Sequence, residues 1–320
     1  MNNPLVSILV PVYNVEAYLS QCLDSLVGQT YPHLQIVLID DGSTDGSWRV
    51  MQEYAARDER IEIYHQENQG VGTTRNHLLE KIKGDYVLFV DSDDWVELDM
   101  VESMISLQNK HKVDLVVCSM VKNNDERITL QDSSIVQYSQ SEIIKAFCEH
   151  TWFSGSLCNK LFAKSLLHTY KFHCGISYGE DALFCWNLLQ HVDRGVVVTN
   201  AQFYHYRRNP QSLSRQKWTP EKKGSGHLVW EEIVKDVSKK WPQYLNITKA
   251  RFAIEDFWGI YFAAISGYPY DEHIEKRQKN VLENWSQIYD SRLLTLDKLL
   301  VAFVLVRWYR FGKVIKWLKG

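Results

Sequence analysis

The chain has 320 residues, of which 45% are hydrophobic and 23% are charged, and its formal net charge is −3. This composition indicates a folded protein with room for one α/β domain and an appendage, and it excludes a globally basic nucleic-acid-binding surface. The six cysteines lack the C-x-x-C spacing of a zinc site. The N-terminus lacks the pattern of a signal peptide, and no apolar run is long enough to span a bilayer. We therefore expect a cytoplasmic protein with reduced thiols.

The first 120 residues alternate short apolar runs with amphipathic stretches. The apolar runs predict strands, and the stretches between them predict helices over about 16–29, 47–56, 71–81 and 101–110. The predicted strands cover residues 6–12, 36–39, 61–64, 86–90 and 115–118. This alternation is typical of a mostly parallel sheet covered by helices on both faces, which binds ligands beyond the carboxyl ends of its strands. Polar residues fall at those ends, at Tyr13-Asn14, Asp40-Asp41, Asn68 and Asp91 to Asp94.

The later part of the chain changes character near residue 216. Residues 121–215 are less regular, with a polar run over 123–134 and an apolar strand over 196–198. From about residue 219 the strand patterns stop, and long helical patterns rich in Trp and Lys follow. We therefore predict an α/β domain over 1–215, divided into 1–120 and 121–215, and an α-helical region over 216–320.

Asp91-Ser92-Asp93-Asp94 follows the apolar run 86–90 directly. Carboxylate oxygens suit Mg²⁺ or Mn²⁺, particularly when substrate phosphates complete the shell. Residues i and i+2 leaving a strand point the same way, so Asp91 and Asp93 can share one ion. The alternative is an acidic turn or a helix N-cap, a position that Asp94 would suit. By itself the Asp91-Ser92-Asp93 triplet does not distinguish a metal site from an acidic turn or a helix cap.

Six strings in one order over about 180 residues resemble family 2 glycosyltransferases. They are Ser7–Asn14 (SILVPVYN), Ser25–Tyr31 (SLVGQTY), Asp40–Asp45 (DDGSTD), Asn68–Asn76 (NQGVGTTRN), Gly84–Asp94 (GDYVLFVDSDD) and Gly179–Asp181 (GED). The ordered set is specific, although no single string is. The chain departs from the family at Thr73-Thr74 and Leu78, where the family usually has Ser-Ala and Gly. Because of these departures, the local backbone conformation and the donor-sugar preference of the family are less readily transferred to this chain.

The resemblance implies a GT-A fold, with a Rossmann-like nucleotide-binding half over 1–120 and an acceptor half over 121–215. It also implies inverting transfer from a nucleoside diphosphate sugar to a hydroxyl of a glycan, lipid-linked or protein-linked acceptor. The implied donor is UDP-linked, with dTDP left open, and the implied cofactor is Mn²⁺ or Mg²⁺. Nucleic acid is not an expected partner, and homodimer formation is left open.

The resemblance also assigns residues to roles. Asp93 would bind the metal and Asp91 would bind the metal or the ribose, with His205 as a third metal ligand, a phosphate contact or a structural residue. Asp181 would be the catalytic base and Glu180 would position the acceptor or backbone, the alternative being two acids that stabilise a helix N-terminus. The donor site would contain Pro11, Val12, Tyr13, Asn14, Asp40, Asp41, Asn68, Arg75 and Ser92, with Arg207, Ser212 and Lys160 as phosphate or loop candidates.

Several of these residues have structural alternatives. Pro11 and Asn14 can merely end a strand, and Asp40 and Asp41 can form a turn with a helix cap. Arg75 would lie near the donor phosphates or form a salt bridge on a helix surface. Arg207 and Ser212 are expected on a mobile loop that closes over the diphosphate.

Residues 295–320 carry six basic side chains and one acid, Asp297, interleaved with Trp308 and Trp317. This pattern favours an interfacial helix on anionic lipid, so peripheral attachment at the inner membrane face is expected. The alternatives are a packed helix with a solvated basic face or a dimer contact.

The alternative functional classes are a sugar-nucleotide nucleotidyltransferase and a non-catalytic glycan-binding relative. A sugar-nucleotide nucleotidyltransferase would need a basic Gly-rich loop after its first strand, where this chain has Val12–Glu16. A non-catalytic glycan-binding relative would be expected to have lost the metal or base carboxylates, which are present.

Overall fold

The computed structural model describes residues 3–122, 134–149, 153–167, 170–209, 219–220, 224–291 and 293–295. The chain divides into two compact units that alternate along the sequence. The first comprises Met1–Ile144, Gly155–Cys174 and Phe184–Asn209, and the second comprises Lys145–Ser154, Gly175–Leu183 and Pro210–Gly320. The boundary predicted near residue 216 falls outside the described residues.

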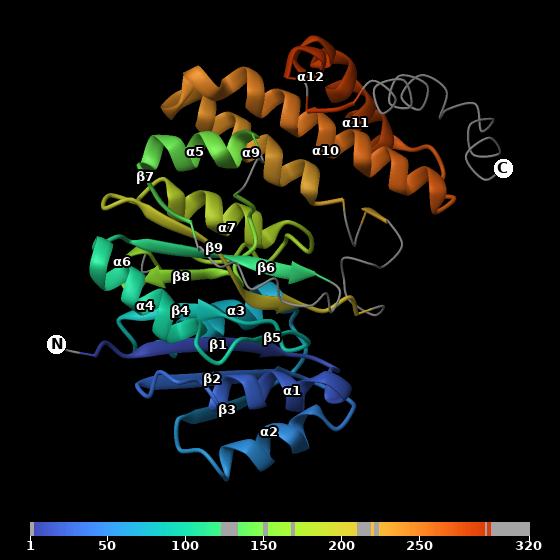
Figure 1. The fold of residues 1–320 in the computed structure, drawn as a ribbon. Coiled ribbons are helices and arrows are strands. Elements are labelled where there is room, and N and C mark those ends of the chain that lie inside the picture. The colour runs from blue at the N-terminus through green and yellow to red at the C-terminus, as the bar shows by residue number, and fades with distance from the viewer. Residues whose placement is uncertain are drawn as a thin grey trace. The chain divides into compact units, whose positions relative to one another are not determined.

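Within the described residues, the first unit contains a nine-stranded sheet (Figure 1). Its order is β3-β2-β1-β4-β8-β6-β9-β5, and β7 pairs with β9. The strands are β1 (Val6–Val12), β2 (Leu34–Asp41), β3 (Ile61–Gln66), β4 (Tyr86–Phe89), β5 (Trp95–Val96), β6 (Leu115–Lys122), β7 (Ile135–Tyr138), β8 (Lys160–Ala163) and β9 (Val196–Tyr206). Strands β1 to β4 are mutually parallel, as are β6 and β9, while β5, β7 and β8 pair antiparallel. The predicted mostly parallel α/β fold is confirmed.

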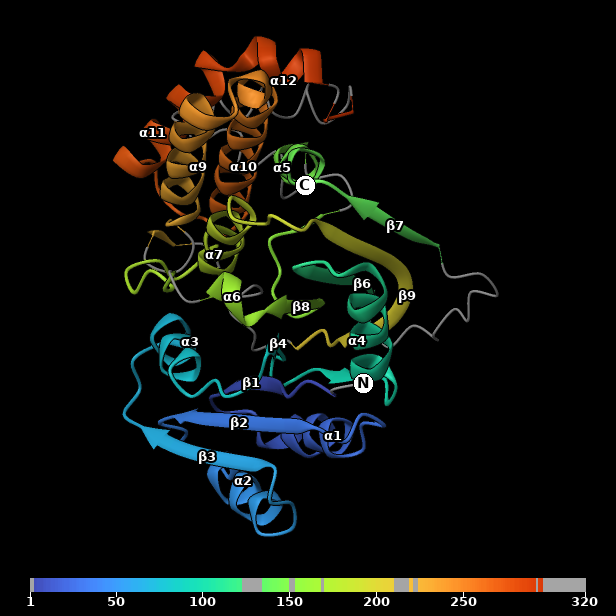
Figure 2. The same cartoon turned by 90° about the vertical axis from the view of Figure 1, so that its left-hand side faces the viewer.

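The helices of the first half begin and end close to the predicted positions. They are α1 (Glu16–Val27), α2 (Ser47–Ala55), α3 (Val71–Leu79) and α4 (Met100–His111). Further along the chain lie α5 (Gln140–Glu149), α6 (Lys164–Leu167) and α7 (Glu180–Leu189). Strand β9 is much longer than the predicted 196–198 and is strongly curved in Figure 2. Its pairing with β6 contains register shifts after Val117 and Ser119.

Alternation along the strands sends neighbouring side chains to opposite faces of the sheet. Ile8 and Val10 of β1, with Leu88 of β4, belong to the cluster that packs against Leu23 of α1. The adjacent residue Phe89 contacts the rings of Phe162, Phe172 and Phe184, at centroid distances of 6.1, 6.0 and 6.3 Å. Both faces of the central strands are therefore covered, which explains their continuous apolar sequences.

The second unit contains α9 (Gly226–Lys240), α10 (Leu245–Ile265), α11 (Glu272–Glu283) and α12 (Trp285–Ser291), with a short 3-10 helix at Pro242–Tyr244. An apolar core joins α10, α11 and α12 through residues such as Phe257, Ile274 and Ile288. Among the helices that the structure describes, none combines the length and apolarity needed to cross a membrane. The basic segment after residue 295 lies outside the described residues.

Candidate functional site

The parallel register brings the carboxyl ends of β1, β2, β3 and β4 to one edge of the sheet. Val12 pairs with Asp40, Asp41 pairs with Gln66, and Leu9 pairs with Phe89, two residues before Asp91. The polar residues that follow these strands therefore share one edge, where parallel sheets bind ligands.

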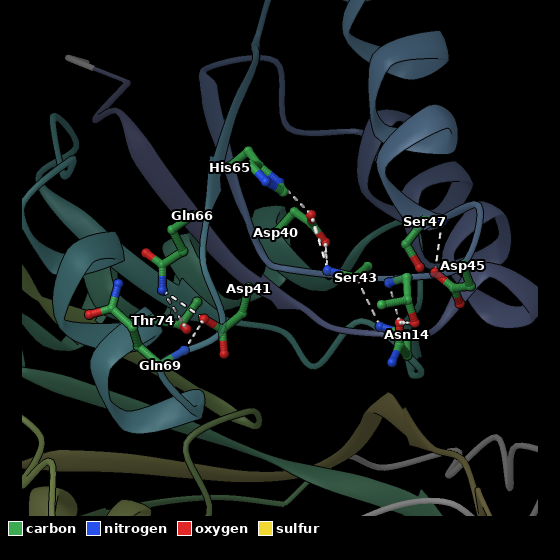
Figure 3. Close-up of polar contacts among 11 residues, drawn as sticks. Asn14, Asp40, Asp41, Ser43, Asp45, Ser47, His65, Gln66, Gln69 and Thr74 are labelled. Atoms are coloured by element: carbon green, nitrogen blue, oxygen red, sulfur yellow. Dashed lines mark hydrogen bonds and ion pairs between the residues drawn. The ribbon is translucent and has the colours of Figure 1, made fainter.

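Asn14 and Asp40 hold the turn that follows β2 (Figure 3). Asp40 is fully buried and accepts hydrogen bonds from the Ser43 backbone at 3.3 Å and from His65 Nδ1 at 2.7 Å. Asn14 adopts a left-handed φ of 50°, donates its backbone N–H to Ser43 Oγ and accepts from the Thr44 N–H at 2.8 Å. The structure therefore places both residues in supporting positions, as the turn alternative proposed.

Around them, Val12 is buried and Pro11 half-buried, whereas Tyr13 is 49% exposed. Asn68 is also exposed, in the loop after β3. Tyr13 thus presents an aromatic surface at the edge where the four strands end, and such a surface suits stacking with a planar ring.

Asp41 is the polar centre of the loop after β3 (Figure 3). Its Oδ1 accepts from Gln66 Nε2 at 2.8 Å and from the Gln69 N–H at 2.9 Å, and its Oδ2 accepts from the Gly70 N–H at 2.9 Å. Gln66 Oε1 in turn lies 2.6 Å from His77 Nδ1. A carboxylate offers about four acceptor positions, so these contacts leave about one on Asp41. Sequence reasoning missed Gln66 and His77, because neither stands in a recognised motif.

Asp91 is held by three different elements. Its Oδ1 accepts from the Arg75 guanidinium at 3.2 Å, its Oδ2 accepts from Cys158 Sγ at 3.0 Å, and its backbone N–H donates to Tyr204 Oη. The Asp91 side chain remains 34% exposed. Arg75 is only 7% exposed and lies over the ring of Phe172, so it is not the helix-surface salt bridge of the alternative interpretation.

Asp93 and Asp94 differ in their surroundings. Asp93 is half-buried and accepts from Asn209 Nδ2 at 3.0 Å; burial and then the Asp91 carboxylate raise its pKa. Asp94 is only 1% exposed and accepts from Tyr204 Oη and from the Arg207 N–H, each at 2.7 Å. Burial, followed by the Asp91 charge, raises the pKa of Asp94 to about 8. These shifts mark a site with an excess of negative charge.

The surroundings of Asp94 and Ser92 bear on two of the sequence predictions. Asp94 does not cap a helix, because it is followed by β5 and α4 begins only at Met100, after Asp99. Ser92, which was predicted to lie in the donor site, is buried at 6% exposure, and its role in donor binding stays a prediction.

Arg207 links the acidic segment, Asp91 to Asp94, to helix α1. Its Nε donates to the Asp93 carbonyl at 2.8 Å, and its guanidinium donates to Gln21 Oε1 at 2.5 Å. The same guanidinium lies over the rings of Tyr18 and Trp95, at 5.0 and 4.6 Å. Arg207 therefore supports the acidic segment in this structure, and its place on a loop that closes over the diphosphate stays a prediction. Ser212, the other loop candidate, lies outside the described residues.

The side chains of His205 and Lys160 both hydrogen-bond to groups within this chain. His205 Nε2 lies 2.7 Å from Glu97 Oε1, and its ring stacks on Trp95. Lys160 is fully buried, and its Nζ donates to the Ser156 carbonyl and to Asn159 Oδ1 at 2.5 and 2.8 Å. Burial removes Lys160 from the phosphate-binding candidates. Within the described part of the chain, no group of three His, Cys, Asp or Glu side chains is arranged to hold a metal.

The carboxylates of Asp91 and Asp93 nevertheless fit a divalent cation of the Mg²⁺ or Mn²⁺ type. Such ions are commonly bound by one or two protein carboxylates, with substrate phosphates and water completing the shell. Burial, and then the nearby Asp91 carboxylate, disfavour the charged form of Asp93. A bound cation would favour that charged form.

In the second unit, Glu180 and Asp181 form the first turn of α7. Gly179 precedes them with a φ of 86°, a conformation that favours glycine. Glu180 is buried, whereas Asp181 is half-buried and its Oδ1 accepts from the Ala182 N–H at 2.8 Å. The positive end of the helix dipole favours the ionised form of both side chains.

Comparison with known proteins places this site in a wider context. Residues 7–170 match the family model described as glycosyl transferase family 2. EpsH of Bacillus subtilis (strain 168), a protein named as a glycosyltransferase, is 34% identical over 239 residues, which cover 72% of this chain and 68% of EpsH.

Two solved structures share the fold. Staphylococcus aureus TarS 1–349, solved with UDP-GlcNAc, has a TM-score of 0.67 at 20% identity, covering 96% of this chain and 92% of that one. The mannosyltransferase PcManGT of Pyrobaculum calidifontis, solved with GDP-Man and Mn²⁺, has a TM-score of 0.60 at 14% identity, covering 97% and 88%. At these identities the likeness establishes the GT-A fold alone.

Proposed function

The chain belongs to glycosyl transferase family 2, and from that membership we propose that it is an inverting, metal-assisted transferase that uses a UDP-sugar. The sugar would pass to a hydroxyl of a glycan, lipid-linked or protein-linked acceptor. The observation that carries this proposal is the convergence of Tyr13, Asp41, Asp91 and Asp93 at one edge of the sheet.

The nucleobase part of the proposal rests on Tyr13 and Asp41. The exposed Tyr13 ring would lie against one face of the base. Asp41 has about one acceptor position left, on Oδ2, after its three hydrogen bonds. A uracil or thymine edge offers one ring N–H, whereas guanine offers adjacent N–H and amino donors that need two acceptors. The acceptor count therefore favours UDP or dTDP over GDP.

The diphosphate part rests on Asp91 and Asp93, which would hold Mn²⁺ or Mg²⁺. When bound, the ion would neutralise the charge that develops on the departing diphosphate. Arg75 and Cys158 fix the orientation of the Asp91 carboxylate, and Asn209 fixes that of Asp93. His205 stays a weaker metal or phosphate candidate, since Glu97 occupies its Nε2.

The chemical step is proposed to use Asp181 as the base. The acceptor hydroxyl would give its proton to the Asp181 carboxylate while its oxygen bonds to the anomeric carbon. The bond from that carbon to the diphosphate oxygen would break at the opposite face, so the anomeric configuration inverts and UDP leaves. Glu180, buried beside Asp181 in the first turn of α7, would support the acceptor or the backbone.

The test measures release of the nucleoside diphosphate from a panel of UDP-, dTDP- and GDP-sugars in Mn²⁺, with and without EDTA. We expect turnover of a UDP- or dTDP-sugar that EDTA abolishes and that D181N lowers by about 10²–10⁴-fold, the range of a lost general base. Turnover that resists EDTA would contradict the metal assignment. Full activity of D181N would contradict the base assignment, and preferential use of a GDP-sugar would contradict the base-recognition assignment.

A further inference from the structure

A single hydroxyl group holds the backbone of Tyr178, three residues before Asp181. The Tyr178 N–H donates to Ser225 Oγ at 2.9 Å, and the Ser225 hydroxyl donates to the Tyr178 carbonyl at 3.0 Å. Both residues belong to the second unit. Because Ser225 acts as donor and acceptor to the same residue, it fixes the position and the orientation of that peptide segment together.

Close packing supports the same contact. Ser225 precedes α9, and a Cβ on the next residue, Gly226, would lie 3.4 Å from the Tyr178 ring. A Cβ on Gly179 would lie 3.4 Å from Val229, one turn further along α9. The Tyr178-Gly179 turn therefore lies next to the first turn of α9, at a distance that the two glycines make short.

The start of α9 is itself fixed by a buried ionic network. Asp256 of α10 is fully buried; it pairs with Arg277 of α11 and accepts from His227 Nδ1 at 2.8 Å. Arg277 donates from its other terminal nitrogen to the Gly224 carbonyl at 2.7 Å, and Asn280 donates to Asp256 Oδ2 at 2.7 Å. Residues on both sides of Ser225 are thus tied to α10 and α11. A buried network of charge-assisted hydrogen bonds such as this one restrains the backbone that it holds.

The turn held in this way leads straight into the first turn of α7. Gly179 has the left-handed φ of 86°, so the direction in which the chain enters α7 is set by the Tyr178-Gly179 turn. Asp181 also lies close enough to act on Tyr178 electrostatically: partial burial, then the charges of Glu255 and Asp181, raise the pKa of Tyr178.

We infer that Ser225 is a positioning residue for sugar transfer: its two hydrogen bonds to Tyr178 transmit the restraint imposed by the α9–α11 network to the proposed base, Asp181. This inference rests on the proposed role of Asp181. Ser225 would not touch substrate. Its loss would leave the base present but free to move, and a displacement on the order of 1 Å is enough to cost about 100-fold in rate.

The test compares S225A, which loses both hydrogen bonds, with S225T, which keeps a hydroxyl. S238A is the matched control, because Ser238 lies on the same helix and its hydroxyl bonds only locally, to the Lys235 carbonyl. Hydrogen exchange of the peptide covering 176–183 is measured without ligand. The rate constant kcat is then measured with the sugar nucleotide from the UDP-, dTDP- and GDP-sugar panel that turns over fastest, and Kd for UDP with Mn²⁺ by calorimetry.

We expect S225A to speed exchange in 176–183 and to lower kcat by about tenfold to 100-fold, with Kd for UDP close to that of S238A. S225T should recover most of both losses. In the D181N background, S225A should cost nothing further, since a group that acts through Asp181 has nothing left to position. Exchange or kcat of S225A equal to that of S238A would overturn the inference, as would an undiminished loss in the D181N background. A fully active D181N instead refutes the base assignment, so the two failures are distinct.

Discussion

Replacing Asp41 by Asn separates the structural role of this carboxylate from its proposed role in base recognition. The variant keeps the shape of the side chain but turns one oxygen into an NH₂ group. Because Oδ1 accepts two hydrogen bonds and Oδ2 accepts one, the best amide orientation places the NH₂ toward Gly70. One bond to a charged group is then lost outright, and the bonds from Gln66 and Gln69 become neutral ones.

The magnitude follows from these three contacts. A hydrogen bond to a charged group contributes about 1.5–3 kcal/mol and a neutral one about 0.5–1.5 kcal/mol. Because Asp41 is only 4% exposed, water cannot replace the lost partner. We therefore expect D41N to lower the free energy of unfolding by about 3.5–6 kcal/mol. The amide also replaces the one acceptor position left for the base, so Kd for UDP should rise at least about tenfold.

The assay is urea denaturation followed by calorimetry with UDP and Mn²⁺, and D58N is the control. Asp58 is also a carboxylate in the first unit, but it pairs with its neighbour Arg60 away from the Asp41 loop. D58N also weakens charge-assisted hydrogen bonds, so it should itself cost about 1–3 kcal/mol, but it should leave Kd for UDP unchanged. An unfolding midpoint of D41N equal to that of wild type would refute the structural reasoning. A destabilised D41N with unchanged Kd would restrict Asp41 to a structural role.

The remaining predictions concern packing, acid stability and the C-terminal segment. G84A should lose about 1–3 kcal/mol of stability, since a Cβ at Gly84 would meet the Ser7 nitrogen at 2.6 Å, while G72A, with its nearest neighbour at 3.7 Å, should be neutral or stabilising in chemical denaturation. Arg60 holds the pKa of Asp58 below its ordinary value of 3.8, so the stability from this pair is present above that pH and is lost as the pH falls through the lower folded pKa; melting temperatures of wild type and D58N should converge there. Sedimentation with acidic liposomes should pellet the full chain but not residues 1–294, and equal recovery would reject the membrane proposal.

The sequence predicted the elements whose apolar residues are continuous or periodic. Strands β1 to β4 and helices α1 to α4 are of this kind, because both faces of the strands and one face of each helix are buried. Strand β5 escaped prediction because two residues carry no periodicity, and β8 because it begins with Lys160. A lysine is normally a surface residue, and the nearby Ser156 and Asn159 oxygens contribute to making its burial possible.

For the candidate site, the sequence predicted the acidic residues but not their partners. Motif order identified Asp41, Asp91 and Asp93, since these acids directly follow strands. Their partners were not predictable, because Cys158 and Asn209 lie 67 and 116 residues away from the acids that they contact. The contacts of Arg207 with Asp93 and Gln21 were likewise not predictable, because they join residues 114 and 186 positions apart.

The long sequence separation of Arg207 from Asp93 also bears on how the protein is made. During synthesis the chain emerges from its N-terminus, so the acidic segment leaves the ribosome 114 residues before the arginine that secures it. Until then Asp93 and Asp94 lack Asn209, Tyr204 and the Arg207 backbone as hydrogen-bond donors. Strands β1 to β4 therefore emerge early, but the charged edge that follows them gains these hydrogen-bond donors only when β9 joins the sheet. A nascent chain stalled before β9 would expose Asp93 and Asp94 without them.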